Sequence, residues 1–411
     1  MTGGRGLQGL LRRRRRSLIA VPHMRMCCIV AIPMLCFVPV AALAQSQSSP
    51  APSPTASATP SAAAPPVPTM SYTEEFLATQ TFTSNVNATG NIGNAGGSDQ
   101  ASRFNISNAS VNVTRNTGFF RYGASVGMYS IPVVGLSGNK TLETNVNTNV
   151  YGPVPSLYVS LNPNDHTSLS IGKLATLIGQ EYTYTYLNSN IQRGLVWNME
   201  TAVSRGVRFT TTEGKYTGAL ELNDGFYSGR YLGVEGSMTL AANANTTYQA
   251  VVVIPNASAP SNPTATIANK RLYNFMYTAT RGNWTFAPYL LFVQSPQSSA
   301  LGYTSNESAY GLVLAATYAF NPTWSLTGRI EDIANQSGTG DQSPNADLVG
   351  YGPGSGAWSF TVSPTYRFKH FLLRGDLSDV SVRSAAPGSA FGATGSLRNQ
   401  FRLVVESGFE F

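Results

Sequence analysis

Charged residues are scarce in this chain of 411 residues. Asp, Glu, Lys and Arg make up 11% of the sequence, against about 25% in ordinary soluble domains. Its polar groups come mainly from Ser, Thr, Asn and Gly, and it carries 20 Tyr and 19 Phe. Such a composition excludes an ordinary soluble surface and favours strands, turns and membrane interfaces over helices.

Cysteine is confined to the first segment, at Cys27, Cys28 and Cys36, and histidine is nearly absent from the rest. His166 and His370 lie far apart in sequence, beside predicted short turns, and neither has an evident Ser and acid partner for a hydrolase site. No zinc-type cluster, phosphate loop or G-x-S-x-G motif is present. We therefore expect no enzymatic activity, no metal and no cofactor.

Long hydrophobic runs are missing beyond Tyr72. A membrane helix needs roughly eighteen or more apolar residues in succession. If this part of the chain crosses a membrane, it must do so with strands.

Basic residues are concentrated at the start, where residues 1–44 hold seven Arg and no acid. This Arg-rich start, the apolar run from Cys27 to Val40, and the small residues Ala42 and Ala44 predict a signal peptide of residues 1–44. An uncleaved anchor is the alternative. The remaining charge balances, with 20 basic and 20 acidic residues, which argues against a nucleic-acid partner.

Residues 45–70 are almost entirely Pro, Ala, Ser and Thr. Such a segment cannot bury enough apolar surface to offset its ordering entropy, so we expect a disordered periplasmic linker.

The rest of the chain, residues 71–411, shows segments of eight to fourteen residues that alternate between apolar and polar side chains. The segment from Trp358 to Phe368 is the clearest, with aromatic and apolar residues against Ser, Thr and Arg. Because successive side chains of a strand point to opposite faces, each such strand separates two media.

Predicted short turns and long loops alternate strictly along these segments. Seven short turns and eight long loops predict about sixteen strands, with both chain ends on the short-turn side. This pattern, with aromatic residues near the strand ends, is typical of an antiparallel up-and-down transmembrane β-barrel in the bacterial outer membrane. A soluble β-sandwich or β-solenoid is the alternative.

The final strand, NQFRLVVESGFEF, resembles the C-terminal signature of outer-membrane barrels. Leu403, Val405, Phe409 and Phe411 match that pattern and Ser407 departs from it. The resemblance implies that the barrel-assembly machinery of a Gram-negative bacterium reads this strand.

The middle of the chain is similar to the β-barrel porins described as OmpL-like. The resemblance rests on LSIGKLATLIGQEYTYTYLNSNIQRGLVWN (169–198), AVSRGVRF (202–209) and ALELNDGFYSG (219–229). It implies an outer-membrane porin.

Strand parity assigns eleven charged residues to the inner face, because a charge facing lipid at mid-depth costs about 2–4 kcal/mol. They are Arg121, Arg208, Glu221, Glu235, Arg329, Glu331, Arg367, Arg374, Asp376, Arg402 and Glu406. Two arrangements are open: a transverse field across a pore, or local ion pairs that stiffen the wall.

The loop from Ala175 to Thr201 is the favoured constriction, since its aromatics would pack on a wall if it folded inward. Its candidate residues are Glu181, Tyr182, Tyr184, Arg193 and Glu200. The loop from Ile131 to Val154 is the other candidate, and an external adhesive loop would share this composition.

We therefore predict a porin whose water-filled channel gives passive diffusion of small hydrophilic solutes, surrounded by outer-membrane lipid. The alternative is a barrel that acts as adhesin or receptor through its external loops. A homotrimer is compatible with the sequence, and the Ala- and Gly-containing strand from Ala309 to Phe320 could supply its seam.

Overall fold

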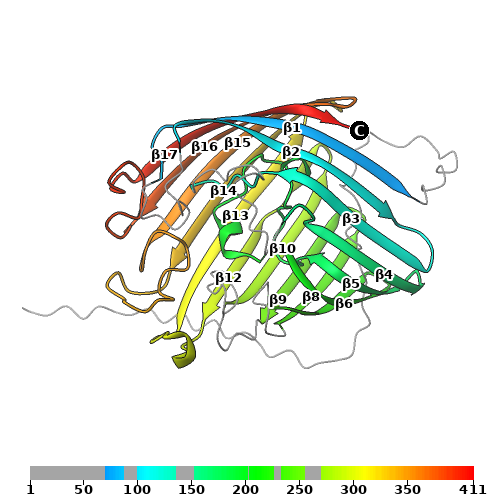
Figure 1. The fold of residues 1–411 in the computed structure, drawn as a ribbon, viewed down its shortest axis with the longest axis horizontal. Coiled ribbons are helices and arrows are strands. Elements are labelled where there is room, and N and C mark those ends of the chain that lie inside the picture. Colours follow the sequence, from blue (N-terminus) through cyan, green and yellow to red (C-terminus); the bar gives the residue numbers. More distant parts are fainter. Residues whose placement is uncertain (1–69, 88–99, 136–151, 202, 226–232, 255–269) are drawn as a thin grey trace, which may run out of the picture. The chain divides into compact units, whose positions relative to one another are not determined.

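The computed structural model describes residues 70–87, 100–135, 152–201, 203–225, 233–254 and 270–411. These residues form one antiparallel sheet (Figure 1). Its strands are β1 (Ser71–Thr83), β2 (Ser102–Arg115), β3 (Phe120–Tyr129), β4 (Ser156–Asn164), β5 (Thr167–Ala175), β6 (Val203–Glu213), β7 (Tyr216–Asn223), β8 (Gly233–Asn243), β9 (Thr246–Ile254), β10 (Arg271–Arg281), β11 (Trp284–Phe286), β12 (Tyr289–Ser295), β13 (Glu307–Ala319), β14 (Trp324–Asn335), β15 (Gly356–Phe368), β16 (Phe371–Arg383) and β17 (Asn399–Glu410). Short 3-10 turns lie at Thr185–Leu187 (η2), Val196–Met199 (η3) and Ser299–Leu301 (η4).

The sheet closes on itself, because β1 pairs with both β2 and β17. Both β11 and β12 pair with β10 on one side and with β13 on the other. They are therefore two parts of one strand, interrupted at Ala287 and Pro288, where proline cannot donate a ladder hydrogen bond. Counted this way the sheet is a closed barrel of sixteen strands, which confirms the predicted fold class.

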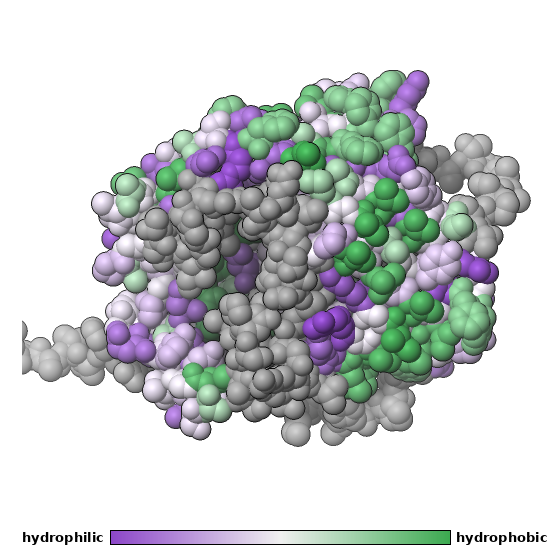
Figure 2. Space-filling model, viewed as in Figure 1, coloured by the Kyte–Doolittle hydropathy of each residue, from purple (hydrophilic) through white to green (hydrophobic). Residues whose placement is uncertain are grey.

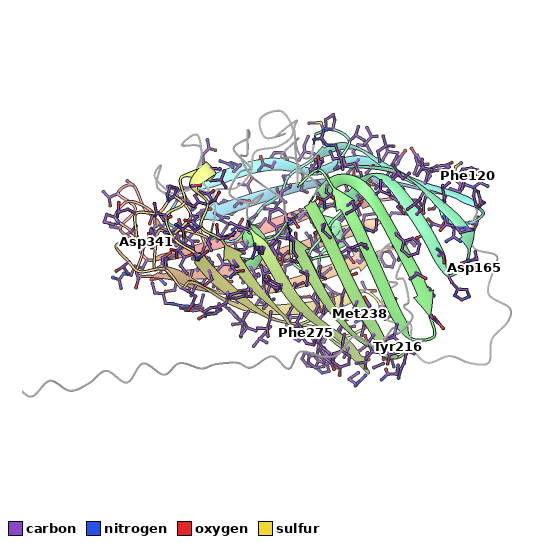
Figure 3. The ribbon with its side chains drawn as sticks, turned by 90° about the horizontal axis from the view of Figure 1, so that it is seen from below. Phe120, Asp165, Tyr216, Met238, Phe275 and Asp341 are labelled. Atoms are coloured by element: carbon purple, nitrogen blue, oxygen red, sulfur yellow. The ribbon has the colours of Figure 1, made fainter. Side chains whose placement is uncertain are left out.

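Connections alternate as predicted (Figure 3). Asp165 and Tyr216 lie by two of the short turns, while Asp341 belongs to a long connection at the opposite end. All seven predicted short turns and all eight predicted long loops separate strands of the structure. Both β1 and β17 bring the described chain ends to the short-turn side, where Phe411 N–H donates to the Glu74 carbonyl at 2.8 Å.

The outer face of the barrel is apolar, and Figure 2 shows hydrophobic residues gathered on the side where β3–β6 lie. Leu157, Ile171 and Leu220 are each at least half exposed on this face. Aromatic side chains collect near the strand ends, for example Trp324 against Tyr366 at 4.8 Å between ring centroids. Lipid shields an apolar outer surface of this kind from water, as it does in a membrane barrel.

An apolar cluster lies on the inner side, which parity did not predict. Val251, Leu272, Leu291 and Val313 on β9–β13 point inward and are buried, and the cluster extends to side chains of the long connections. Strands such as β12, YLLFVQS, are apolar on both faces, the pattern of a strand buried on both sides. The inner face of these strands is therefore a packed core.

The suggested subunit seam on β13 differs from the structure in one respect. Ala309, Gly311 and Ala315 point inward, whereas the outward residues include Tyr310 and Leu314, which are 38% and 50% exposed. Small residues here make room for side chains inside the barrel and do not form a lipid-facing groove.

The predicted signal peptide (1–44), including Ala42 and Ala44, and all of the predicted linker (45–70) except Met70 lie outside the described residues. Among the residues that are described, no helix has the length and apolar character to cross a membrane.

Candidate functional site: an inward-folded loop and two inner walls

Residues 176–201 of the connection between β5 and β6 fold into the barrel. At its start, Thr176 Oγ1 and Leu177 N–H both donate to Glu235 Oε1 on β8, at 2.6 and 2.8 Å. Gly179 N–H then donates to Asn274 Oδ1 on β10 at 3.0 Å. These hydrogen bonds hold the first part of the loop against the inner face of β8 and β10.

The loop next reaches β14 through a buried charge cluster. Glu181 pairs with Arg329, whose Nε lies 3.2 Å from Glu331 on the same strand. The Glu331 carboxylate also accepts the backbone N–H groups of Leu195 and Val196 at 3.0 and 3.2 Å. Because Arg329 and Glu331 are almost fully buried, this cluster fixes both the outgoing and the returning arm of the loop.

Two charged residues of β16 and β17 hold the tip of the loop. Thr185 Oγ1 donates to Glu406 Oε1 at 2.6 Å, and Arg374 Nη1 donates to the Asn188 carbonyl at 2.7 Å. Asn108 of β2 donates a further side-chain hydrogen bond to Thr185.

The return arm is held by Asp376 of β16, which accepts the Gln192 N–H at 2.7 Å. Arg402 of β17 donates to the Gln192 side chain at 3.3 Å. The loop therefore contacts strands around most of the ring.

The predicted loop residues are all described. Glu181 joins the charge cluster, and Tyr184 packs edge-on to Tyr129 at 5.4 Å between ring centroids. The buried Arg193 donates through Nε to the Tyr182 carbonyl at 3.0 Å and lies 6.0 Å from the Trp197 ring. Burial, together with the charge of Glu181, raises the pKa of Glu200 to about 8.

The other candidate loop meets this one directly. Val134 N–H donates to the Arg193 carbonyl at 2.9 Å, and Arg193 N–H donates to the Pro132 carbonyl at 2.9 Å. Its described start, 130–135, thus supports the inward-folded loop, and most of its remainder lies outside the described residues.

Nine of the eleven charged residues assigned inward by parity are at most 9% exposed, and Arg121 and Arg367 are partly exposed. Oppositely charged neighbours pair across adjacent strands. Arg208 Nε donates to Glu221 at 2.7 Å and Arg374 Nε to Glu406 at 3.0 Å, in both cases between direct register partners. This geometry matches the local-pairing alternative more closely than a transverse field.

Near the short-turn end, the two partly exposed cations also have acidic partners. Arg121 lies 3.5 Å from Asp165, and Arg367 pairs with Glu410. His370 Nδ1 lies 2.8 Å from the Glu410 carbonyl oxygen and its ring stacks on Phe411.

We define the charged wall as Arg329, Glu331, Arg374, Asp376, Arg402 and Glu406, on β14, β16 and β17. All six side chains are at most 3% exposed because the loop covers them. The inner surface formed by β4–β6 differs from the charged wall in composition and exposure.

We define the serine–glycine wall as Tyr158, Ser168, Ser170, Gly172 and Gly206, which share the inward parity of β4–β6. All five are partly exposed. Ser170 Oγ donates to Ser160 Oγ at 3.1 Å, so this wall is polar without being charged.

Some residues that hold the loop carried no distinctive signal in the sequence. Glu75 of β1 is buried and accepts a hydrogen bond from Asn112 of β2, which also donates to Tyr186 of the loop at 3.0 Å. A Cβ placed on Gly311 of β13 would come within 2.8 Å of Val196 and 2.9 Å of Met199. The strand pattern shows that Gly311 points inward, but it does not show which loop meets it.

Within the ranges that the structure covers, no group of three or more His, Cys, Asp or Glu side chains has the arrangement of a metal site.

Comparisons with known proteins agree with this geometry. The family described as "Putative beta-barrel porin-2, OmpL-like" matches residues 77–411. A search of the curated proteins finds no match.

Among the solved structures that share the fold are three outer-membrane proteins. The outer membrane channel DcaP of Acinetobacter baumannii aligns with a TM-score of 0.56 and 10% identity over 83% of this chain and 97% of its own. An anion-selective porin from Comamonas acidovorans gives 0.51 and 11% over 82% and 100%. The outer-membrane protein OmpT of Vibrio cholerae gives 0.51 and 9% over 83% and 97%.

The family match covers most of the chain, and the fold is shared with these outer-membrane proteins. The chain belongs to the OmpL-like β-barrel porin family and is an outer-membrane protein of a Gram-negative bacterium.

Proposed function

We propose that the protein forms a water-filled channel through which small hydrophilic solutes diffuse passively. The observation that carries this proposal is the contrast inside the barrel, where a loop covers one wall and leaves the serine–glycine wall partly exposed. Barrels of sixteen strands are wide enough to leave an aqueous channel beside such a loop. The loop of residues 176–201 then acts as the constriction.

The route runs along β4–β6, where hydroxyl and glycine backbone groups can replace water around a passing solute. The inner charges are paired locally, as in Arg208–Glu221 and Arg374–Glu406, so they produce little net field. The channel therefore discriminates weakly between anions and cations and excludes solutes mainly by size. No covalent step and no cofactor take part.

The test is single-channel recording of the purified protein in a planar bilayer, with ion selectivity taken from the reversal potential. Stepwise openings with a reversal potential near zero in a salt gradient support the proposal. Insertion without steps contradicts it and favours the alternative, a barrel that acts through its external loops. Entry of sugars of increasing size into liposomes gives the size limit independently of current.

The same single-channel recording also tests the oligomeric state. One of the similar structures is a trimer form of OmpT of Vibrio cholerae, at a TM-score of 0.51 and 9% identity. If this protein is also a homotrimer, openings occur in groups of three equal steps. Its assembly by the barrel-assembly machinery through Leu403, Val405, Phe409 and Phe411 is a second proposal, supported by the outward position of these side chains on the closing strand.

A further inference from the structure

Tyr158 of β4 is the aromatic member of the serine–glycine wall. Its sequence neighbours Leu157 and Val159 are 55% and 48% exposed on the outer face, so Tyr158, which has the opposite parity, points into the barrel. Its side chain is partly exposed. The ring therefore faces the space that the proposed channel occupies.

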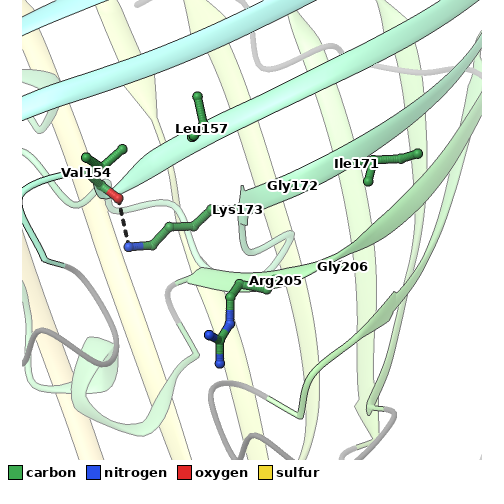
Figure 4. Close-up of a pocket in the computed structure, with 7 residues that line it drawn as sticks. All are labelled: Val154, Leu157, Ile171, Gly172, Lys173, Arg205 and Gly206. Atoms are coloured by element: carbon green, nitrogen blue, oxygen red, sulfur yellow. Dashed lines mark hydrogen bonds between the residues drawn. The ribbon is translucent and has the colours of Figure 1, made fainter.

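Glycines are the direct strand neighbours of Tyr158 on both sides. The register pairs Tyr158 with Gly123 of β3 and with Gly172 of β5, and it pairs Gly172 with Gly206 of β6. Figure 4 shows Gly172 and Gly206 on their two adjacent strands. Because glycine has no side chain, these three positions leave room for the ring along the inner wall.

The ring of Tyr158 lies along this wall. A Cβ placed on Gly123 would come within 2.6 Å of the ring and 2.8 Å of its hydroxyl oxygen, so the far end of the side chain covers Gly123. A ring that reaches from β4 over the next strand does not stand upright in the lumen. Gly123 is buried whereas Tyr158 is partly exposed, so the side of the ring away from Gly123 stays open.

Serine hydroxyls occupy the inward positions before and after Tyr158. Towards the short turns, Ser160 of β4 is paired with Ser170 of β5, and their hydroxyl oxygens are 3.1 Å apart. Towards the long loops, Ser156 of β4 is paired with Ser125 of β3. A solute on the ring would therefore meet hydrogen-bonding groups along the wall in both directions.

The ring also lies close to the inward-folded loop. Ser125 donates a hydrogen bond to Asn112 of β2, and Asn112 donates to the Tyr186 hydroxyl of the loop at 3.0 Å. Since Ser125 is in register with Ser156, two residues before Tyr158, the ring is one inward position away from this contact. Tyr158 thus belongs to the part of the channel that the loop narrows.

The charged side chains in the neighbouring row are paired. This row runs from Arg121 through Ser160 and Ser170 to Arg208 and Glu221. Arg208 donates to Glu221 at 2.7 Å, and Arg121 lies 3.5 Å from Asp165. The surroundings of the ring therefore favour an uncharged solute.

An aromatic face between rows of hydroxyls suits a solute with one apolar face and a hydroxyl rim. A pyranose ring has this form, because its C–H groups carry partial positive charge and match the negative face of an aromatic ring. Its hydroxyls then project sideways. An acyclic polyol has the same hydroxyls but no such face.

We propose that Tyr158 is a stacking platform for pyranose sugars within the channel. The C–H face of the sugar contacts the open side of the ring, and its hydroxyls exchange hydrogen bonds with the serines beside it. This inference rests on the proposed channel function and adds a class of solute and a residue that selects it.

The test is the titration of maltotriose onto single channels of the whole processed protein, with the half-blocking concentration as the readout. Tyr158→Leu keeps an apolar side chain over Gly123 but removes the aromatic face. Its half-blocking concentration should rise about two- to tenfold, the range expected for one aromatic contact. Tyr158→Phe keeps the ring and should be blocked like the wild type.

Tyr273→Leu is the matched control, because Tyr273 of β10 is 39% exposed on the lipid-facing side. It should also be blocked like the wild type. Sorbitol, an acyclic polyol, should block the wild type and Tyr158→Leu equally. Open channels show that a variant is assembled, and if Tyr158→Leu gives none, Tyr158→Met takes its place with a flexible apolar side chain.

Three outcomes would overturn the stacking proposal alone, with channels still open. They are equal block of the wild type and Tyr158→Leu by maltotriose, equal loss of block in Tyr158→Phe and Tyr158→Leu, and block by choline in place of maltotriose. The last would assign the ring to cations. Absence of channels in the wild type would contradict the proposed function and this inference together.

Discussion

The two sides of the barrel's inner surface are built from different chemistry. On β14, β16 and β17 the charged wall consists of Arg, Glu and Asp side chains that are at most 3% exposed. On β4–β6 the serine–glycine wall consists of small hydroxyl side chains, glycines and Tyr158, and it stays partly exposed. Inward-facing positions of the strands thus form two kinds of surface. The charged wall contacts the inward-folded loop, whereas the serine–glycine wall stays partly exposed.

The difference shows what buried charge does in this protein. Residues such as Glu331, Asp376 and Glu406 accept hydrogen bonds from the loop of residues 176–201, so they hold a protein segment in place. Glu331 and Glu406 are in addition paired with Arg329 and Arg374. In the proposed channel, polar residues without charge line the route, and charged residues position the loop that narrows it.

The largest expected effect comes from Arg329→Gln, which breaks the cluster that joins Glu181 and Glu331. Removal of one partner of a buried ion pair typically costs about 3–5 kcal/mol, because the other charges stay buried and uncompensated. The loop should detach from the charged wall, which lowers the thermal unfolding temperature and raises single-channel conductance. Both are measured on the purified protein.

Arg367→Gln is the control for this variant, because Arg367 pairs with Glu410 and its side chain is 40% exposed. Exposed ion pairs contribute about 0–1 kcal/mol, so little change is expected. If both variants show the same stability and conductance, the cluster does not hold the loop.

A smaller effect is expected from Gly311→Leu, which overfills the contact between β13 and the loop. A Cβ at this position already lies within 2.9 Å of Val196 and Met199. Overpacking typically costs about 1–3 kcal/mol, and the displaced loop should also change the conductance. Gly328→Ala is the matched control on β14, since its Cβ meets nothing within 4 Å. An unfolding midpoint of Gly311→Leu equal to that of the control would exclude tight packing at this contact.

Glu200 should contribute to the pH dependence of stability. Its pKa is about 8 in the folded protein, against an ordinary value of 4.5. The folded state therefore binds more protons than the unfolded state in this window, so stability falls as pH rises from about 4.5 to about 8. Thermal unfolding at a series of pH values should show that Glu200→Gln removes part of this fall. The exposed Glu213→Gln should keep the wild-type profile.

The smallest effect is a partial loss of current after labelling of single cysteines. Residues 71–411 contain no cysteine, so introduced thiols are the only targets in a chain that begins after the predicted signal peptide. Ser168→Cys and Ser170→Cys on the serine–glycine wall should react with a bulky water-soluble thiol reagent and conduct less. Ser359→Cys and Ser378→Cys, at positions 0% and 2% exposed on the covered side, should react slowly. Equal reaction rates at all four positions would remove the distinction between the walls.

The sequence was sufficient to predict the sixteen-stranded barrel, because the rules that set it are local. Period-two alternation showed the two faces of each strand, and the predicted short turns and long loops marked the connections. The assignment of charged residues to the inner side followed from the cost of charge in lipid.

The partners of those residues could not be predicted from the sequence. Parity shows that Gly311 and Val313 point inward, but it does not show that Val196 and Met199 fill the space before them. The inner apolar cluster was missed for the same reason. A strand that is apolar on both faces requires a second buried surface, and that surface comes from segments far away in the chain.

The closure of the ring between β1 and β17 has a consequence for biogenesis. Phe76 is paired with Phe409, so the first strand finds its second neighbour only after the last strand has been made. A chain that lacks β17 leaves β1 and β16 as open edges, and open edges template misassociation. Closure is thus a check on completeness, because a prematurely terminated product cannot complete the ring.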